Sequence, residues 1–319
     1  MRRITLLLVG MLALFSTTAQ RKNFTYKFYG FVRGDLFYNS RANMAPIDGN
    51  FYLYPLDKSF DADGKDLNAT PNGSFYTFTS RLGLDVTGPD IGKARSSAKI
   101  ETDFGGFSGS NTMLRIRQAY VNLDWGKSAV LVGITWHPLF GAVMPDVLNL
   151  STGAPFQPFN RSPQIRYQYK ANSRVQLTAS VLWQLQYLSS GPKGMSEDYI
   201  KNSCIPEMFV GADFTPADGW LMGLGAHMIS LKPRTSTEWK EQTFKVNERM
   251  TAFSYEAHLK YSGRNYTFAA KTLMASALDH TALLGGYGVS SVDSRTGEQG
   301  YTCLLYPSPS PRDTERPRM

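Results

Sequence analysis

Charged side chains that could bind a solute recur at alternate positions along several segments of this chain. Arginine presents a planar fork of donors that matches a carboxylate, and rings of Arg and Lys favour anions. Acidic side chains fall on the same faces, so pairing within the protein is the competing chemistry. The candidate solute-binding residues are Arg33, Arg81, Arg95, Lys99, Arg115, Arg117, Arg166 and Lys170, with Asp35, Asp85, Glu101 and Asp103.

Two interpretations of this set stay open. In the first, a basic ladder faces an acidic patch, and together they orient solutes across a narrow passage. In the second, the opposite charges pair with each other and stiffen the wall without selecting any solute.

Other constellations predict no catalysis and no metal. Asp61-x-Asp63-Gly64-x-Asp66 resembles the start of a calcium loop but lacks the later Glu, which favours a solvated loop. The histidines, His137, His227, His258 and His280, have no metal-ligand spacing. A hydrolase would need a Ser or Asp beside a His, and the sequence singles out no such pair. We expect a protein without cofactor or enzymatic activity.

The element that must position the first charged residues is the stretch FTYKFYGFVRGDLFY, residues 24–38. Its even positions are apolar or Gly, with aromatics towards both ends, while Lys27, Arg33 and Asp35 share the odd face. A period of two predicts a β-strand with two different environments. In a transmembrane barrel the apolar face meets lipid and the polar face lines the lumen.

The same alternation recurs along the chain and gives eleven strand candidates in all. The parity slips within 113–124, which predicts a β-bulge near Gln118. The further candidates are 74–87, 94–104, 113–124, 130–137, 165–170, 175–187, 208–214, 220–230, 253–261 and 266–274.

The connections alternate between long and short. Short turns occupy 88–92, 125–128 and 171–173, whereas 40–72, 138–162, 189–205, 231–248 and 278–300 are long. Outer-membrane barrels join their strands in this way, and a soluble β-sandwich would not require it. Both patterns therefore predict an all-β, transmembrane antiparallel up-and-down barrel. Loop 138–162, long and Pro-restricted, is the best candidate to fold into the pore.

The chain start and composition agree with export to a membrane. Residues 1–19 predict a signal peptide, with Arg2 and Arg3 before an apolar core and small residues at 17–19. Residues 20–302 are then the barrel. The formal net charge of +8 is mild and lacks a clustered recognition motif, which excludes nucleic acid as an expected partner. Only Cys204 and Cys303 occur, so no disulfide scaffold is expected.

Residues 303–319 differ from everything before them. They show no alternation, and Cys303 to Asp313 resembles the translation of a sequencing-library adapter, with a change at Pro307. We expect a non-native tail, or a disordered Pro-rich one. On this interpretation the barrel is incomplete, since single-chain bacterial barrels have an even number of strands.

Several strand signatures resemble the DcaP-like outer-membrane porins. They are FYGFVRGDLFY, SRLGLDV at 80–86, AKIETDF at 98–104, and LRIRQAYVNLDWG followed by VGITWHP. The resemblance implies a trimer of barrels with about sixteen strands and arginine-lined pores, passing small anionic or zwitterionic solutes. It also implies that roughly five strands are absent from this chain.

The expected function is passive diffusion of small anionic solutes through an Arg/Lys-lined channel in the Gram-negative outer membrane. The protein would contact membrane lipid and form a homo-oligomer, a trimer by resemblance. An alternative is a barrel that acts as a surface receptor or adhesion module through its long loops. A secreted soluble β-protein is a third class, and it would need no detergent.

Overall fold

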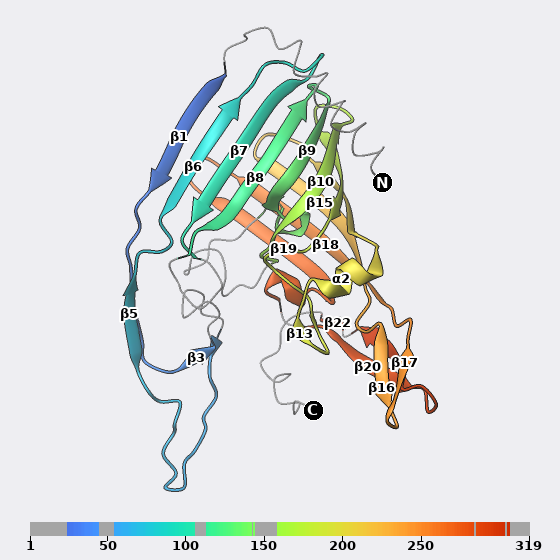
Figure 1. The fold of residues 1–319 in the computed structure, drawn as a ribbon. Helices are drawn as coiled ribbons and strands as arrows, with labels where there is room; N and C mark the ends of the chain where they lie inside the picture. Colours follow the sequence, from blue (N-terminus) through green and yellow to red (C-terminus); the bar gives the residue numbers. More distant parts are fainter. Residues whose placement is uncertain are drawn as a thin grey trace.

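A computed structural model describes residues 24–44, 54–105, 113–141, 143, 158–283, 285–303 and 305–306. Eleven long strands follow one another in a single antiparallel sheet, joined at one edge by a two-residue strand, β22. Figure 1 shows the sheet curving around a central space, with β1 and β6–β8 opposite β18 and β19. In the described residues the order of strands runs from β1 at one edge to β22, beside β19, at the other, and the sheet is not closed.

The strand bounds match most of the sequence predictions. The eleven strands are β1 (Thr25–Phe31), β6 (Arg81–Thr87), β7 (Arg95–Asp103), β8 (Arg115–Asp124), β9 (Ser128–Trp136), β10 (Arg161–Lys170), β11 (Val175–Leu182), β14 (Glu207–Phe214), β15 (Trp220–Leu231), β18 (Met250–Ser262) and β19 (Thr267–Ser276). Each pairs with the next through an antiparallel ladder, as an up-and-down meander requires.

The apolar face of the sheet points outward. Phe28, Val32 and Leu36 are 80%, 90% and 82% exposed, so no second layer covers them within the described chain. Leu82, Ile100, Val132, Ile165, Leu224 and Phe253 continue this exposed band on later strands. Such a surface is costly in water and suits lipid. The predicted antiparallel sheet with an apolar outside is confirmed.

The predicted 15-residue first strand is wrong in its length. It breaks at 32–34 into β1 and β2 (Asp35–Asn39), and β2 pairs with β5 (Asn72–Tyr76) in a separate ribbon. The physical reason is a turn in the segment that precedes β6, the strand paired with β1. In this turn the N–H of Ser80 bonds to the carbonyl of Thr77. The Ser80 hydroxyl then accepts the N–H of Arg33, so the ladder stops on both strands at the same level.

The predicted bulge lies where the parity slips. Glu101 pairs with Gln118, but the next residue, Thr102, pairs with Ile116, so Arg117 is the extra residue of β8. Arg115 and Arg117 are both buried, with Ile116 exposed between them, as regular alternation requires, and the bulge changes the parity of the residues that follow Arg117.

Loop lengths follow the predicted alternation, but several long loops contain regular structure. Figure 1 shows these elements gathered at one end of the sheet, with the short turns at the other. They are β3 (Asn43–Met44) with β4 (Tyr54–Pro55), β12 (Ser190–Gly191) with β13 (Gly194–Met195), helix α2 (Asp198–Ser203), β16 (Ser236–Trp239) with β17 (Gln242–Lys245), and β20 (Tyr287–Val292) with β21 (Gln299–Cys303).

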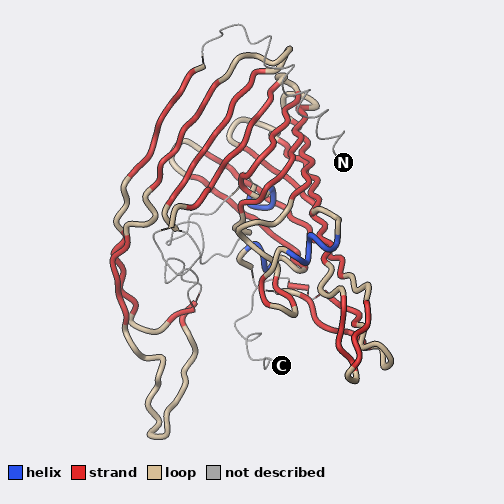
Figure 2. The backbone as a smooth tube through the Cα atoms, viewed as in Figure 1, coloured by secondary structure: helices blue, strands red, loops and turns tan. Residues whose placement is uncertain are grey.

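Other boundaries differ from the predictions as well. The predicted strand 74–87 is divided between β5, which ends at Tyr76, and β6, which begins at Arg81. Strand β10 begins at Arg161, inside the predicted loop 138–162, and β11 ends at Leu182, well before residue 187. Two 3₁₀ turns, η1 (Pro138–Phe140) and η2 (Asp279–Thr281), lie within the curve of the sheet, and Figure 2 shows them as short blue segments.

The two chain ends are described only in part. The predicted signal peptide, 1–19, lies outside the described residues, as do 307–319. Cys303 ends β21, and Leu305–Tyr306 forms β22, which pairs with Ala275 and Ser276 of β19. Among the described helices, none has the length and apolarity needed to span a membrane.

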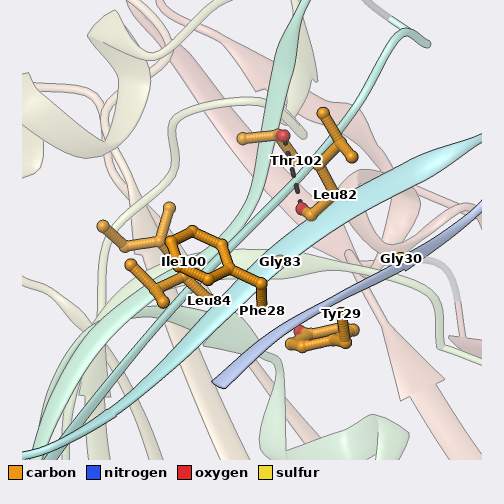
Figure 3. A pocket seen from close by; sticks show the side chains of 8 residues that line it. All are labelled: Phe28, Tyr29, Gly30, Leu82, Gly83, Leu84, Ile100 and Thr102. Carbon is orange, nitrogen blue, oxygen red and sulfur yellow. Dashed lines mark hydrogen bonds between the residues drawn. The ribbon is translucent and has the colours of Figure 1, made fainter. Parts of the chain in front are cut away.

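A glycine on β6 makes room for an aromatic ring on the inner side. Gly83 pairs with Tyr29, and a Cβ at Gly83 would lie 2.2 Å from a ring carbon of Tyr29. Figure 3 shows the Tyr29 ring on one side of the strands and Phe28, Leu84 and Ile100 on the other, around a shallow apolar pocket. Gly83 is therefore required by close approach of a ring.

We predict that Gly83→Ala destabilises the protein by about 1–3 kcal/mol, because the Tyr29 ring must leave its position. Urea unfolding of the protein in lipid vesicles measures this change. Gly288→Ala in β20 is the control, since no atom lies within 4 Å of its Cβ position. Equal stability of the two variants would contradict the close-approach interpretation.

Glu248 joins two of the ribbons that lie beyond the sheet. It accepts hydrogen bonds from Arg234 Nη2, the Tyr301 hydroxyl and the Gln299 N–H, at 2.5, 2.5 and 2.8 Å. Arg234 Nη2 also donates to the carbonyl of Gly297 at 2.9 Å. The β16–β17 ribbon and the β20–β21 ribbon are thereby held together.

Burial alone would raise the pKa of Glu248, but the bonds from Arg234, Tyr301 and Gln299 lower it below its ordinary 4.5. A carboxyl with a lowered folded pKa stabilises the fold above its unfolded pKa and stops doing so as the pH falls through the lowered value. The ribbons should therefore hold together at neutral pH and separate in acid. At pH 7 we predict that Glu248→Gln speeds tryptic cleavage after Lys240 about tenfold, since a hydrogen bond to a charged group is worth about 1.5 kcal/mol.

Glu238→Gln is the matched control for this prediction. Glu238 carries the same charge in β16, and it forms no salt bridge within the described part of the chain. Equal cleavage of the two variants would show that Glu248 does not hold the ribbons.

Candidate functional site

The inner wall of β7 and β8 holds a buried network of opposite charges. Arg115 donates to both oxygens of Asp103, at 2.8 and 2.6 Å. Arg117, the bulge residue, donates to Asp103 at 2.9 Å and to Glu101 at 2.7 Å. All four side chains are buried, so these predicted site residues come together as ion pairs.

A second group of predicted residues is linked through Tyr29. Its hydroxyl donates to Glu101 at 3.0 Å and accepts from Lys99 at 3.0 Å. Lys99 Nζ also lies 2.9 Å from Asp85. These contacts extend the network from β8 across β7 and β6 to β1.

Two further pairs lie nearer the ends of the wall. Arg33 donates to Asp35 at 2.7 Å, and the Thr79 hydroxyl donates to the other Asp35 oxygen at 2.7 Å. Arg95 lies 2.7 Å from Asp124, with its side chain 74% exposed. Pairing therefore accounts for five of the basic candidates.

Three basic candidates form no salt bridge within the described residues: Arg81, Arg166 and Lys170. Each lies on the face opposite to the exposed apolar side chains of its own strand. Arg81 lies 5.3 Å from the Phe31 ring centroid, and its Nε has no hydrogen-bond partner. Arg166 donates to Gln164 at 3.0 Å and to the carbonyl of Trp136 at 2.5 Å. Arg81 therefore has an aromatic ring beside it, and Arg166 has an amide and a carbonyl oxygen as its partners.

Arg161 is a buried cation that sequence reasoning missed. It has no exposed surface, and its guanidinium lies 4.9, 5.4 and 5.6 Å from the ring centroids of Trp136, Phe159 and Tyr187. Its Nη2 donates to the Tyr187 hydroxyl at 2.8 Å. Aromatic faces stabilise a desolvated guanidinium through their quadrupoles. The sequence predicts a loop over 138–162, so Arg161 was not expected among the residues of the inner wall.

The first residues of loop 138–162 pack against the inner wall. Pro138, Leu139 and Phe140 are buried, and Lys271 of β19 donates to the carbonyls of Leu139 and Phe140. At the other end of the loop, the N–H of Phe159 bonds to the carbonyl of Thr281. The described ends of this loop therefore cross the space inside the curved sheet, and residues 144–157 lie outside the described part.

A cavity of about 260 Å³ lies under this crossing. Arg166 of β10 is on one side, and Asp213 and Glu256 come from β14 and β18. His258 Nε2 is 3.0 Å from Asp213, and Lys271 is 3.3 Å from Glu256. The cavity therefore has mixed charge, with the guanidinium of Arg166 in its lining.

Three of the histidines lie around one carboxylate. They are far apart in the sequence, so their spacing gave no sign of this group. The Nε2 atoms of His137, His227 and His280 lie 3.3, 3.3 and 3.2 Å from Glu207 Oε2. The fourth histidine, His258, is not part of this group.

The calcium-like loop uses its carboxylates internally. Asp61 accepts the N–H groups of Asp63 and Lys65, and Asp66 pairs with Arg41 at 2.6 Å. These bonds agree with the solvated-loop interpretation.

Comparison with known proteins identifies this curved sheet. The family model described as DcaP outer membrane protein matches residues 17–183, just over half of the 319 residues. The chain belongs to the DcaP family of outer-membrane proteins. This confirms the resemblance found in the strand signatures and places the protein in the outer membrane of Gram-negative bacteria.

Solved structures agree with the fold. The outer-membrane channel DcaP of Acinetobacter baumannii is 22% identical with a TM-score of 0.59, covering 80% of this chain and 64% of that one. The chain therefore spans less than two thirds of that channel's length. OmpT of Vibrio cholerae matches as a loop L8 deletion mutant (13% identity, 80% and 70% covered, TM-score 0.49) and in a trimer form (13%, 80% and 66%, 0.48). A search of curated proteins gave no significant match.

The buried network predicts a large effect of removing Asp103. Asp103→Asn should cost this DcaP-family protein about 3–5 kcal/mol, because Arg115 and Arg117 lose their charged partner in a buried place. Urea unfolding in lipid vesicles measures the cost. Arg95→Gln breaks an exposed pair and should cost less than about 1 kcal/mol. Similar costs for both variants would mean that the network does not hold the wall.

Proposed function

We propose that this DcaP-family protein forms a passive channel whose lumen favours small anionic solutes. The observation that carries the proposal is the set of inner-wall cations that form no salt bridge in the described chain, namely Arg81, Arg166 and Lys170. Unpaired guanidinium and ammonium groups keep a positive potential along the path, and that potential attracts anions. No reaction is catalysed, and solutes move down their gradients.

The paired residues have a different part in this proposal. Arg115 and Arg117 are neutralised by Asp103 and Glu101. Their contribution is to keep the wall rigid, as the pairing interpretation of the sequence has it. In this proposal, the cations outside the network and the mixed-charge cavity beside Arg166 select which solutes pass. The predicted solute-binding set is thus divided into a structural part and a selective part.

Lipid contact and assembly belong to the same proposal. The exposed apolar band on β1, β6 and later strands supports a boundary with lipid acyl chains. The trimer implied by the family resemblance stays a prediction, and chemical crosslinking in native membranes tests it.

A receptor or adhesion role through the long loops is the second candidate. It is favoured by the Glu248-linked ribbons β16–β17 and β20–β21, which extend from the sheet as one ordered unit. Such a role needs no open pore, so conductance separates it from the first candidate.

Planar-bilayer recordings under a salt gradient test the channel. We predict that Arg81→Gln with Arg166→Gln lowers the ratio of anion to cation permeability at least about twofold, because both unpaired charges leave the path. Arg95→Gln with Arg33→Gln is the matched control, since it removes two charges that are already paired. Equal shifts in reversal potential would overturn the selective role, and the absence of any conductance would favour the receptor.

A further inference from the structure

We propose that His137, Glu207 and His280 form a binding site for a late first-row divalent cation such as Zn²⁺, with His227 and Gln184 orienting the carboxylate. The three proposed ligand residues come from distant parts of the chain: the end of β9, the start of β14 and the turn η2. One ligand atom from each lies within 4.8 Å of the others.

The separations around Glu207 fit a small tetrahedral site. Zn²⁺ binds His nitrogen and carboxylate oxygen at about 2.0–2.1 Å, so the edge of a regular tetrahedron is about 3.3–3.4 Å. Glu207 Oε2 lies 3.3 Å from His137 Nε2 and 3.2 Å from His280 Nε2. Imidazole with a carboxylate suits Zn²⁺, Cu²⁺ or Ni²⁺, whereas Ca²⁺ and Mg²⁺ prefer all-oxygen sites.

The burial of this group calls for a positive charge. Glu207 and His137 have no exposed surface, and His280 is 2% exposed. Within the described residues the salt-bridge partners of Glu207 are three imidazoles, and no Lys or Arg pairs with it. A buried carboxylate is costly without a positive charge beside it, which a protonated imidazole or a divalent cation bound by the same imidazoles would supply.

The surroundings hold the carboxylate in place. Gln184 Nε2 donates to Glu207 Oε1 at 2.8 Å, and the Ser189 hydroxyl accepts from the same amide at 2.8 Å. His227 Nε2 lies 3.3 Å from Glu207 Oε2. Hydrogen bonds of this kind fix the orientation of metal ligands and are a normal part of metal centres.

One contact must change when a cation binds. His137 Nδ1 accepts the N–H of Leu139 at 3.2 Å, which places the ring proton on Nε2. Coordination through Nε2 transfers that proton to Nδ1, so the Leu139 N–H must turn away. Cation binding therefore acts on η1, the turn that begins the loop crossing the lumen.

The site lies next to a cavity. His137 lines the 260 Å³ cavity under the loop, together with Arg166 and His258. A cation that arrives from the inside of the curved sheet would therefore pass the ring of His137 to reach the other two ligands. Once bound, it would tie His137, the residue that caps η1, and His280 of η2 to Glu207 of β14.

Metal analysis of the full chain, purified from outer membranes in detergent, tests the site. The protein is first treated with a chelator, then loaded with Zn²⁺ and desalted. We expect about one Zn²⁺ per chain. For Glu207→Gln and His280→Gln we expect at least about 100-fold weaker binding, beyond what loss of a supporting residue alone would give. His258→Gln, which removes a lumen histidine outside the group, should bind like the wild type.

Two additional measurements keep the outcome clear if a variant folds poorly. Heat-dependent migration on gels reports whether each variant is a folded barrel, and only folded samples are compared. Co²⁺ loading of the wild type alone should give the strong visible bands of a four-coordinate ion with nitrogen and oxygen ligands. Failure of the wild type to retain Zn²⁺, or equal binding by Glu207→Gln, would overturn the proposal.

Discussion

A backbone in lipid must satisfy its own hydrogen bonds, and the structure of this protein depends on that constraint. Eleven long strands meet it through antiparallel ladders that run from β1 to β19. The ladder fixes the pleat, and the pleat sends alternate side chains to lipid and to the lumen. The charged residues of β6 to β10 owe their position on the inner face to this alternation.

Opposite charges on the inner face lie in two different arrangements. Where β7 and β8 face each other, Arg115 and the bulge residue Arg117 both contact Asp103, and Arg117 also contacts Glu101. Those charges are buried and mutually compensated. Arg81 and Arg166 form no salt bridge within the described residues, and Arg166 donates instead to the carbonyl of Trp136. In the proposed channel, selection of solutes belongs to these two cations.

The lumen is also shaped from within. The turn η1 carries Leu139 into a core with Leu182, Phe209 and Leu278, so an apolar cluster lies inside a wall that is otherwise polar. Beside it, three histidines surround Glu207. Together these contacts anchor the start of loop 138–162, and they connect the strands on one side of the curve with those on the other.

The sequence by itself determined the strands, their outward face and the loop alternation, because side-chain parity and turn chemistry are local properties. It also located the bulge near Gln118, since one inserted residue inverts the parity of all that follow. The break of the stretch 24–38 was beyond it, because the interruption comes from a turn at Ser80, far along the chain. The sequence also could not predict which side chains pair with one another. Which arginines pair, how Arg161 is enclosed by aromatic rings, and how His137, His227 and His280 meet Glu207 depend on register between strands and on loops that fold inward. Those are long-range contacts, and only the tertiary structure decided them.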